Sequence, residues 1–165
     1  MSEYKWTREE FQALVVNLEE TPGKVRRLVE SLGEGEKVWK PVANEFSAIE
    51  NVCHLRDIEE EGYCVRIQRL MEETEPYLND LDGARLARER DYNSQNMNEA
   101  LERFTQARGR NVTTVRSLQL EGLNRRGTFE GTGAVTLGQL LLMMREHDEA
   151  HIRELENLRA HLSGD

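Results

Sequence analysis

The chain has 165 residues, of which 38% are hydrophobic and 32% charged, and it carries a formal net charge of −9. This length fits one well-buried core and excludes two ordinary domains, so we expect a single domain over residues 1–165. The negative charge, without a dense Lys/Arg stripe, argues against nucleic acid as a partner, and the longest apolar run, residues 140–144, is too short to span a membrane.

The first predicted helix begins near Thr7. Thr7 and Glu10 form a capping-box pattern, and apolar residues follow at helical spacing. Thr21 followed by Pro22 repeats the start signal, so the segment is either one helix kinked there or two short helices in sequence. Glycines at positions 33 and 35 end it.

A second capping box, Ser47 with Glu50, opens a long periodic segment that runs to about Thr74 and stops before Pro76. We interpret it as the second long helix. Residues 75–93 mix turn-forming residues with many charges, which predicts a connection with a short helical piece, where a crossover or lid could lie.

The third helix is predicted from Met97 to no later than Gly122, and the glycines at positions 127, 131 and 133 then predict a flexible loop. Thr136 with Gln139 is a third capping box, from which a fourth helix reaches about Leu162. We therefore expect an all-α four-helix bundle of the up-down-down-up type, with a long connection between the second and third helices.

The two cysteines indicate a cytoplasmic protein. If both lie on one helix, Cys53 and Cys64 are about 16 Å apart, beyond the reach of a disulfide. Free thiols fit a reducing compartment, and residues 1–5 lack an apolar signal-peptide core.

Polar residues interrupt the apolar stripe of the fourth helix. Projection at about 100° per residue places His147, Asp148 and His151 inside the arc of its leucines, so these side chains should point into the bundle. Burial of polar groups is costly unless a partner satisfies them. Because His147 and His151 lie one turn apart on one face, they can converge on a single ion.

A third ligand is needed, since most such pairs on a helix bind no metal. His54 is the candidate, because it shares a predicted stripe with Ile58, Glu61 and Val65 on the second helix. His161 lies near the end of the chain and is expected in solvent. Three neutral imidazoles suit a divalent ion such as zinc or nickel and leave a coordination position open, which permits catalysis through activated water or a thiol.

Two other metal motifs are excluded by spacing. Glu149 lies about 200° around the helix from His147, so the segment is not a zinc-protease motif. A di-iron bundle needs Glu-x-x-His pairs, whereas Asn51 precedes His54 and Asp148 precedes His151 at that spacing.

The order of these motifs resembles the DinB/YfiT-like superfamily over roughly residues 7 to 160. The resemblance rests on Thr21-Pro22, then Phe46-Ser47 with residues 54–57 (His-Leu-Arg-Asp), then Thr136-Leu137 with His147-Asp148 and His151. It implies a four-helix bundle, commonly a homodimer, with zinc, nickel or a similar ion on the three histidines. Relatives include S-transferases that use bacillithiol or mycothiol, a mycothiol-dependent isomerase and proteins assigned as metal-dependent hydrolases. Phe46 stands where the family usually has Trp.

Three further residues are candidates for supporting roles. Asp57 could orient His54 or accept a proton, although an exposed carboxylate is an equal alternative. Asp148 should hydrogen bond to a neighbouring helix or a ligand. Arg108 lies on the apolar stripe of the third helix and could hold a substrate carboxylate, with a structural ion pair to a glutamate as the alternative. The acidic run 59–61 is expected mostly in solvent.

The sequence leaves two functional hypotheses open. The first is a metal-dependent enzyme, an S-transferase or hydrolase, in which a low-molecular-weight thiol or water attacks a small electrophilic substrate. The second is a non-catalytic metal-binding bundle with a structural or protein-interaction role.

Overall fold

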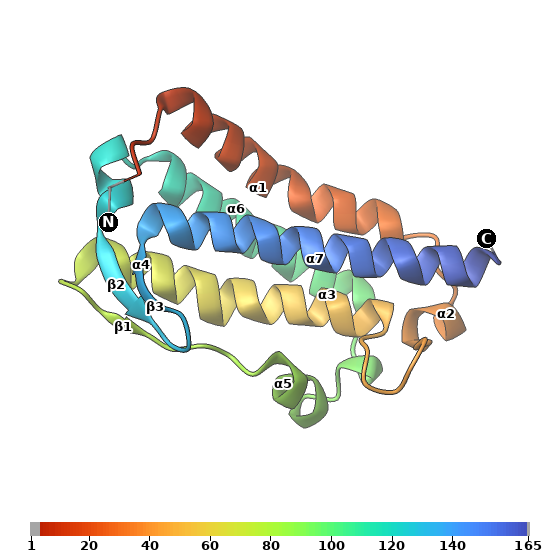
Figure 1. The fold of residues 1–165 in the computed structure, drawn as a ribbon. Coiled ribbons are helices and arrows are strands. Elements are labelled where there is room, and N and C mark those ends of the chain that lie inside the picture. The colour runs from red at the N-terminus through yellow and green to blue at the C-terminus, as the bar shows by residue number, and fades with distance from the viewer. Residues whose placement is uncertain (1–3, 165) are drawn as a thin grey trace.

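The computed structural model describes residues 4–164. Residues 1–3 and 165 of the expected domain lie outside this range, and so does part of the segment 1–5 that was expected to lack a signal peptide. Four long helical segments pack side by side (Figure 1). The second segment is a continuous run of α3, a π-helical turn η1, and α4. The bounds are α1 Arg8–Val29, α3 Ala48–Asp57, η1 Ile58–Tyr63, α4 Cys64–Glu72, α6 Met97–Arg116 and α7 Leu137–Ser163.

The prediction of a four-helix bundle is confirmed. In Figure 1, α1 and α7 run in one direction and α3–α4 and α6 in the other, as the up-down-down-up order requires. The connection between α4 and α6 returns along the length of the bundle and contains β1 (Tyr77–Leu78), α5 (Gly83–Glu89) and the short helix η2 (Tyr92–Ser94). A short helix α2 (Glu34–Val38) follows α1. No described helix combines the length and apolarity of a membrane span.

The three predicted capping boxes are present. The side chains of Thr7, Ser47 and Thr136 accept hydrogen bonds from the backbone N–H three residues on, and the Glu or Gln there bonds back to the cap. These bonds satisfy N–H groups that have no partner inside a helix. They explain why sequence alone located these three helix starts.

Pro22 lies inside a single helix, so the alternative of two short helices is excluded. Proline has no N–H for the carbonyl four residues earlier. The Leu18 carbonyl, which is thereby left free, accepts a hydrogen bond from Nη1 of Arg108 at 2.8 Å. A side chain from α6 thus replaces the bond that Pro22 removes from α1.

The π-helical turn η1 changes which face of the second segment is buried. Sequence periodicity placed Glu61 and Val65 on the stripe of His54, but both are exposed, Val65 by 45%. Gly62 and Arg66 are buried instead. One extra residue in the turn rotates the following helix, so the predicted stripe is wrong beyond Ile58.

The segment before α7 was predicted as a flexible loop, and the structure corrects this because the segment forms a β-hairpin. β2 (Arg126–Phe129) pairs antiparallel with β3 (Gly133–Thr136), and β1 adds to β2 in parallel. Gly131 and Gly133 adopt φ values of +74° and +97° at the turn. Glycine permits this backbone, so here it closes a hairpin.

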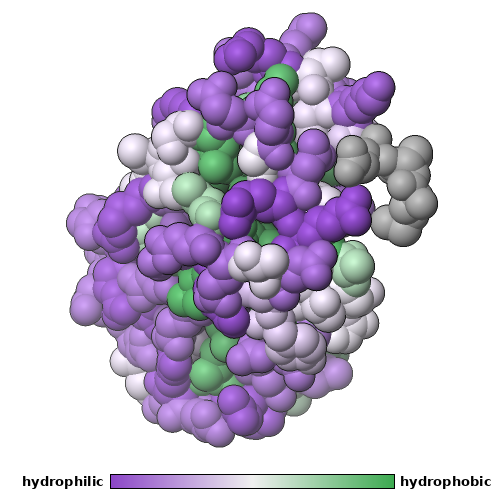
Figure 2. Space-filling model, turned by 90° about the vertical axis from the view of Figure 1, so that its left-hand side faces the viewer, coloured by the Kyte–Doolittle hydropathy of each residue, from purple (hydrophilic) through white to green (hydrophobic). Residues whose placement is uncertain are grey.

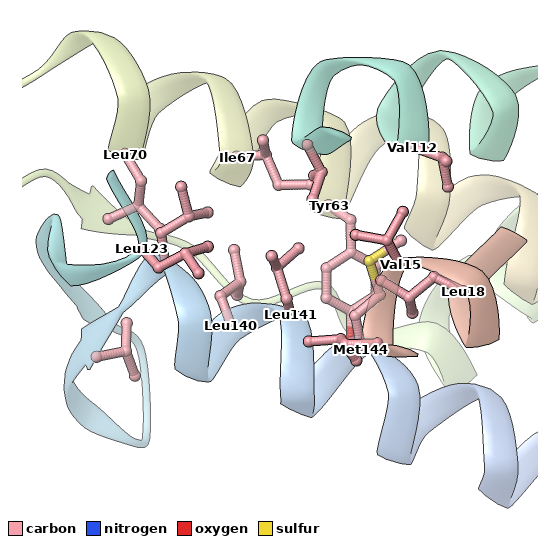
Figure 3. Packing of buried hydrophobic residues seen from close by; sticks show 14 of the residues in the cluster. Val15, Leu18, Tyr63, Ile67, Leu70, Val112, Leu123, Leu140, Leu141 and Met144 are labelled. Atoms are coloured by element: carbon pink, nitrogen blue, oxygen red, sulfur yellow. The ribbon is translucent and has the colours of Figure 1, made fainter. Parts of the chain in front are cut away.

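A polar layer divides the core into two hydrophobic clusters. Figure 3 shows the cluster nearer the sheet, where Tyr63, Ile67 and Leu70 face Leu140 and Leu141. Figure 2 shows that the sheet end of the molecule is mostly hydrophilic outside, with small separate apolar patches. The polar layer consists of the buried or half-buried residues that lie between the clusters along the helices: Thr21, His54, Glu59, Arg108, Asn111, His147, Asp148 and His151.

Candidate metal centre

Three histidines from two helices converge within the polar layer. One nitrogen from each of His54, His147 and His151 lies within 4.8 Å of the others. His54 comes from α3 and the other two from α7, and Nε2 of His54 lies 3.0 Å from Nε2 of His147. His54 and His151 are buried and His147 is half-buried. The structure therefore brings together the three residues that the sequence singled out.

Asn51 holds the ring of His151 in place. Its Oδ1 lies 2.6 Å from Nδ1 of His151, and a carboxylate oxygen of Glu154 lies 3.4 Å from the same nitrogen. An acceptor at Nδ1 favours the tautomer with its proton there, which leaves a lone pair on Nε2 for a ligand. The hydrogen bond with His151 holds the pKa of Glu154 below its ordinary value.

The donor set fits a divalent transition-metal ion. Burial and the neighbouring His151 lower the pKa of His54 to about 3, and the same causes hold the pKa of His147 well below its ordinary value. Both rings are therefore neutral at physiological pH and offer lone pairs. Within the described part of the chain, Nδ1 of each ring is buried without a hydrogen-bond partner. Such incompletely satisfied polar rings are costly in a core and are typical of a ligand site.

Gly83 at the start of α5 packs directly against His54, a contact that the sequence gave no reason to expect. A Cβ atom at this position would lie 2.4 Å from Cε1 and 2.6 Å from Nδ1 of the ring. Glycine is thus required by close approach. The long connection therefore covers one face of the histidine cluster.

Substitution Gly83→Ala should displace the His54 ring and weaken metal binding at least tenfold, because one of the three ligands would no longer be in position to bind the ion. Titration with zinc in competition with a chromophoric chelator measures this. Gly109→Ala is the matched control, since an added Cβ there meets nothing within 4 Å. The control should bind zinc normally and gain up to about 1 kcal/mol of stability from helix propensity. Equal zinc affinity in both variants would contradict the assigned contact.

Two cavities reach the histidines. One, of about 410 Å³, is lined by His54 and His147 together with Tyr63, Arg66 and Phe129. The other, of about 780 Å³, is lined by His151, Glu154 and Phe46 among others. The ring of Phe46 lies 5.4 Å from that of His54 and 6.3 Å from that of His151, so Phe46 forms a wall of the site. His161 lies at the rim of the larger cavity and is exposed, as expected.

Within the described residues, Asp57 neither hydrogen bonds to His54 nor lies in solvent, which were the two predicted alternatives. It is 1% exposed, and its oxygens accept hydrogen bonds from Arg56, Arg90 and Tyr92 at 2.6–2.7 Å. No bond to His54 is recorded for it in residues 4–164. Asp57 ties α3 to the long connection, so the structure does not support a role in orienting His54.

Arg108 and Asp148 belong to a buried charge network beside the histidines. All five N–H groups of Arg108 have acceptors: two oxygens of Glu59, two of Asp148 and the Leu18 carbonyl, at 2.7–2.9 Å. Asp148 also accepts a bond from Thr21, as its predicted contact with a neighbouring helix requires. Arg108 therefore has no free donor for a substrate carboxylate, and the alternative, a structural ion pair with a glutamate, is what the structure contains.

The same network corrects the interpretation of the acidic run. Glu59 is 1% exposed, and Asn111 donates a further bond to it at 2.8 Å. Only Glu61 is exposed, while Glu60 is half-buried and pairs with Arg103. Four residues of the site were not identified as such from the sequence: Asn51, Glu59, Arg66 and Gly83. No local signal pointed to Arg66, because the predicted stripe placed Val65 on the buried face and the π turn η1 buries Arg66 instead.

Comparisons with known proteins agree with this fold. No curated protein matches the chain significantly. The solved structure of YfiT from Bacillus subtilis superposes with a TM-score of 0.90 at 20% identity, covering 99% of this chain and 93% of that one. YfiT is described as a probable metal-dependent hydrolase with an unusual four-helix bundle topology. The family model of the DinB superfamily matches residues 4–155, so the chain belongs to the DinB superfamily.

Proposed function

We propose that the chain is a metal-dependent hydrolase of a small molecule, with His54, His147 and His151 as ligands of one zinc or nickel ion. The observation that carries this proposal is the convergence of three histidine nitrogens beside a 410 Å³ cavity, which His54 and His147 line. The description of YfiT as a probable metal-dependent hydrolase supports it by analogy of fold.

The number of ligands favours catalysis over a structural role. Among residues 4–164, the candidate metal cluster contains three histidines and no fourth Cys, Asp or Glu. Structural zinc sites usually have four protein ligands, whereas catalytic sites keep a position open. The cavity next to His54 and His147 gives a substrate access to that position.

Each part of the site has a defined task in this proposal. A bound divalent ion would supply Lewis-acid activation of water at neutral pH. Asn51 fixes the ring of His151, and Gly83 allows the close packing that fixes His54. Phe46 and Tyr63 are aromatic walls, which limit the water around the reacting groups.

Thiol-dependent S-transfer is a second candidate. The observation in its favour is the separate 780 Å³ cavity at His151, which shares no lining residue with the first. It offers room for a second reactant such as a low-molecular-weight thiol. Hydrolysis needs one organic substrate and would use one cavity, whereas thiol transfer needs two reactants and would use both cavities.

The test starts with metal analysis of protein purified without added metal, which should give about one divalent ion per chain. Hydrolysis of a panel of small esters and amides, and thiol transfer to small electrophiles, are then assayed with and without chelator. We expect one activity that chelator and His147→Ala both abolish. A metal-loaded protein inactive in both screens would favour the non-catalytic, structural alternative.

We also propose a cytoplasmic homodimer. Two free cysteines, one buried and one half-buried, support a reducing compartment. The resemblance to DinB-like proteins, which are commonly homodimers, supports the dimer. Light scattering at micromolar concentration should give about twice the mass of 19.1 kDa, and a monomer mass would refute the dimer.

A further inference from the structure

The charge of Arg66 is less well compensated than that of the other buried arginines. Arg56 bonds to Asp57 and Gln95, and Arg108 bonds to two buried carboxylates. Arg66 has a side chain that is 5% exposed, and among residues 4–164 its one ion pair is with Asp80 at 3.4 Å. The Asp80 side chain is itself 62% exposed, so solvent weakens this pair.

The surroundings of Arg66 hold its guanidinium in one place. It lies over the rings of Tyr63 and Phe129, with 5.4 and 4.6 Å from Cζ to the ring centroids. Its Nε donates to the Asn79 carbonyl at 3.1 Å. No hydrogen bond is recorded for its Nη1 within the described residues. Burial holds the pKa of Arg66 below its ordinary value, whereas ion pairing raises that of Arg108 despite burial.

The position of Arg66 relates it to the candidate metal centre. Arg66, His54 and His147 line the same 410 Å³ cavity, whose remaining walls are largely apolar or aromatic. The carboxylates of this lining, Asp80 and Glu146, are both exposed, so solvent screens their repulsion of an anion. A planar fork of donors and largely apolar walls in one cavity fit a ligand with a carboxylate and an apolar body.

We propose that Arg66 is the specificity residue of this cavity and binds the carboxylate of a small organic acid, whose apolar part lies along Tyr63 and Phe129. This inference rests on the proposed function for the idea that the cavity holds the substrate. It assigns to Arg66 the role that the sequence suggested for Arg108.

Calorimetric titration with phenylacetate and with its neutral analogue phenylacetamide tests the proposal. The wild type, with and without zinc, should bind phenylacetate at least tenfold more tightly than phenylacetamide. Arg66→Gln should weaken phenylacetate binding about 10- to 100-fold and leave phenylacetamide unchanged, since a hydrogen-bonded charge pair contributes that much. Asp80→Asn removes a competitor for the guanidinium and should strengthen phenylacetate binding.

The controls separate this proposal from the proposed function. Arg69→Gln alters a half-buried arginine one turn further along α4 and should bind both ligands as the wild type does. Arg66→Lys keeps the positive charge but lacks the planar guanidinium, so it should bind phenylacetate with intermediate affinity. This variant also tests the site if Arg66→Gln does not fold. Zinc stoichiometry should be normal in all the arginine variants and in Asp80→Asn.

No preference of the wild type for the acid, or equal phenylacetate affinity in the Arg66 variants and the wild type, would overturn the proposal, whatever the metal content. Loss of zinc binding in His147→Ala with the carboxylate preference intact would support it. Failure of every hydrolysis assay with the preference intact would also support it while removing the proposed activity.

Discussion

Replacement of Arg108 by leucine should lower the free energy of unfolding by about 3–5 kcal/mol, the cost of leaving buried charges without their partner. Arg108, Glu59 and Asp148 are each about 1% exposed, so water cannot replace the lost cation. The substitution also frees the Leu18 carbonyl opposite Pro22, which adds an unsatisfied acceptor in the core. Urea denaturation followed by circular dichroism measures the change.

Arg103→Leu is the matched control for this experiment. Arg103 lies on the same helix and pairs with Glu60, but its side chain is 48% exposed. A solvent-exposed pair contributes about 1 kcal/mol or less, so this variant should unfold near the wild-type midpoint. A similar decrease in the free energy of unfolding in both variants would contradict the expected cost of removing Arg108 from its buried charge network.

His54→Ala should abolish most of the stabilisation that zinc or nickel gives to the fold. An ion bound only by the folded chain stabilises it by RT ln(1 + [L]/Kd), about 4 kcal/mol at a thousandfold excess over Kd. His54 is the single ligand from α3, so without it the ion no longer joins α3 to α7. Thermal melting with metal and with chelator measures the shift, and the helical signal should persist because the two hydrophobic clusters remain.

His161→Ala controls for loss of a histidine as such, because His161 lies exposed on α7 outside the cluster. It should keep the full metal-dependent shift. A full shift in His54→Ala would show that His54 is not a ligand and that the three-histidine site is wrong.

The sequence alone determined the helices and the histidine cluster because the signals for both are local. Each capping box joins residues three positions apart, and a cap satisfies the same orphan N–H groups wherever the helix lies. On α7, the apolar stripe fixes which face is buried, so the burial of Asp148 and His151 followed from spacing. His54 lies before the π turn, where the α-helical period still holds, so its own burial was predicted correctly although its stripe is wrong beyond Ile58.

Only the tertiary structure decided what lies beyond that turn. The Glu59 carbonyl accepts the Cys64 N–H, which defines the π turn, and the Glu59 side chain pairs with Arg108 and Asn111 on α6. A π turn is unfavourable in isolation, so these contacts with a distant segment stabilise it, and no local pattern announces them. The same turn places Arg66 rather than Val65 at the cavity. Gly83 against His54 is a second case, because the need for glycine arises from a ring 29 positions earlier in the chain. Periodicity reports which face of one element is buried, but the partner that compensates a buried charge comes from another element, and only folding brings the two together.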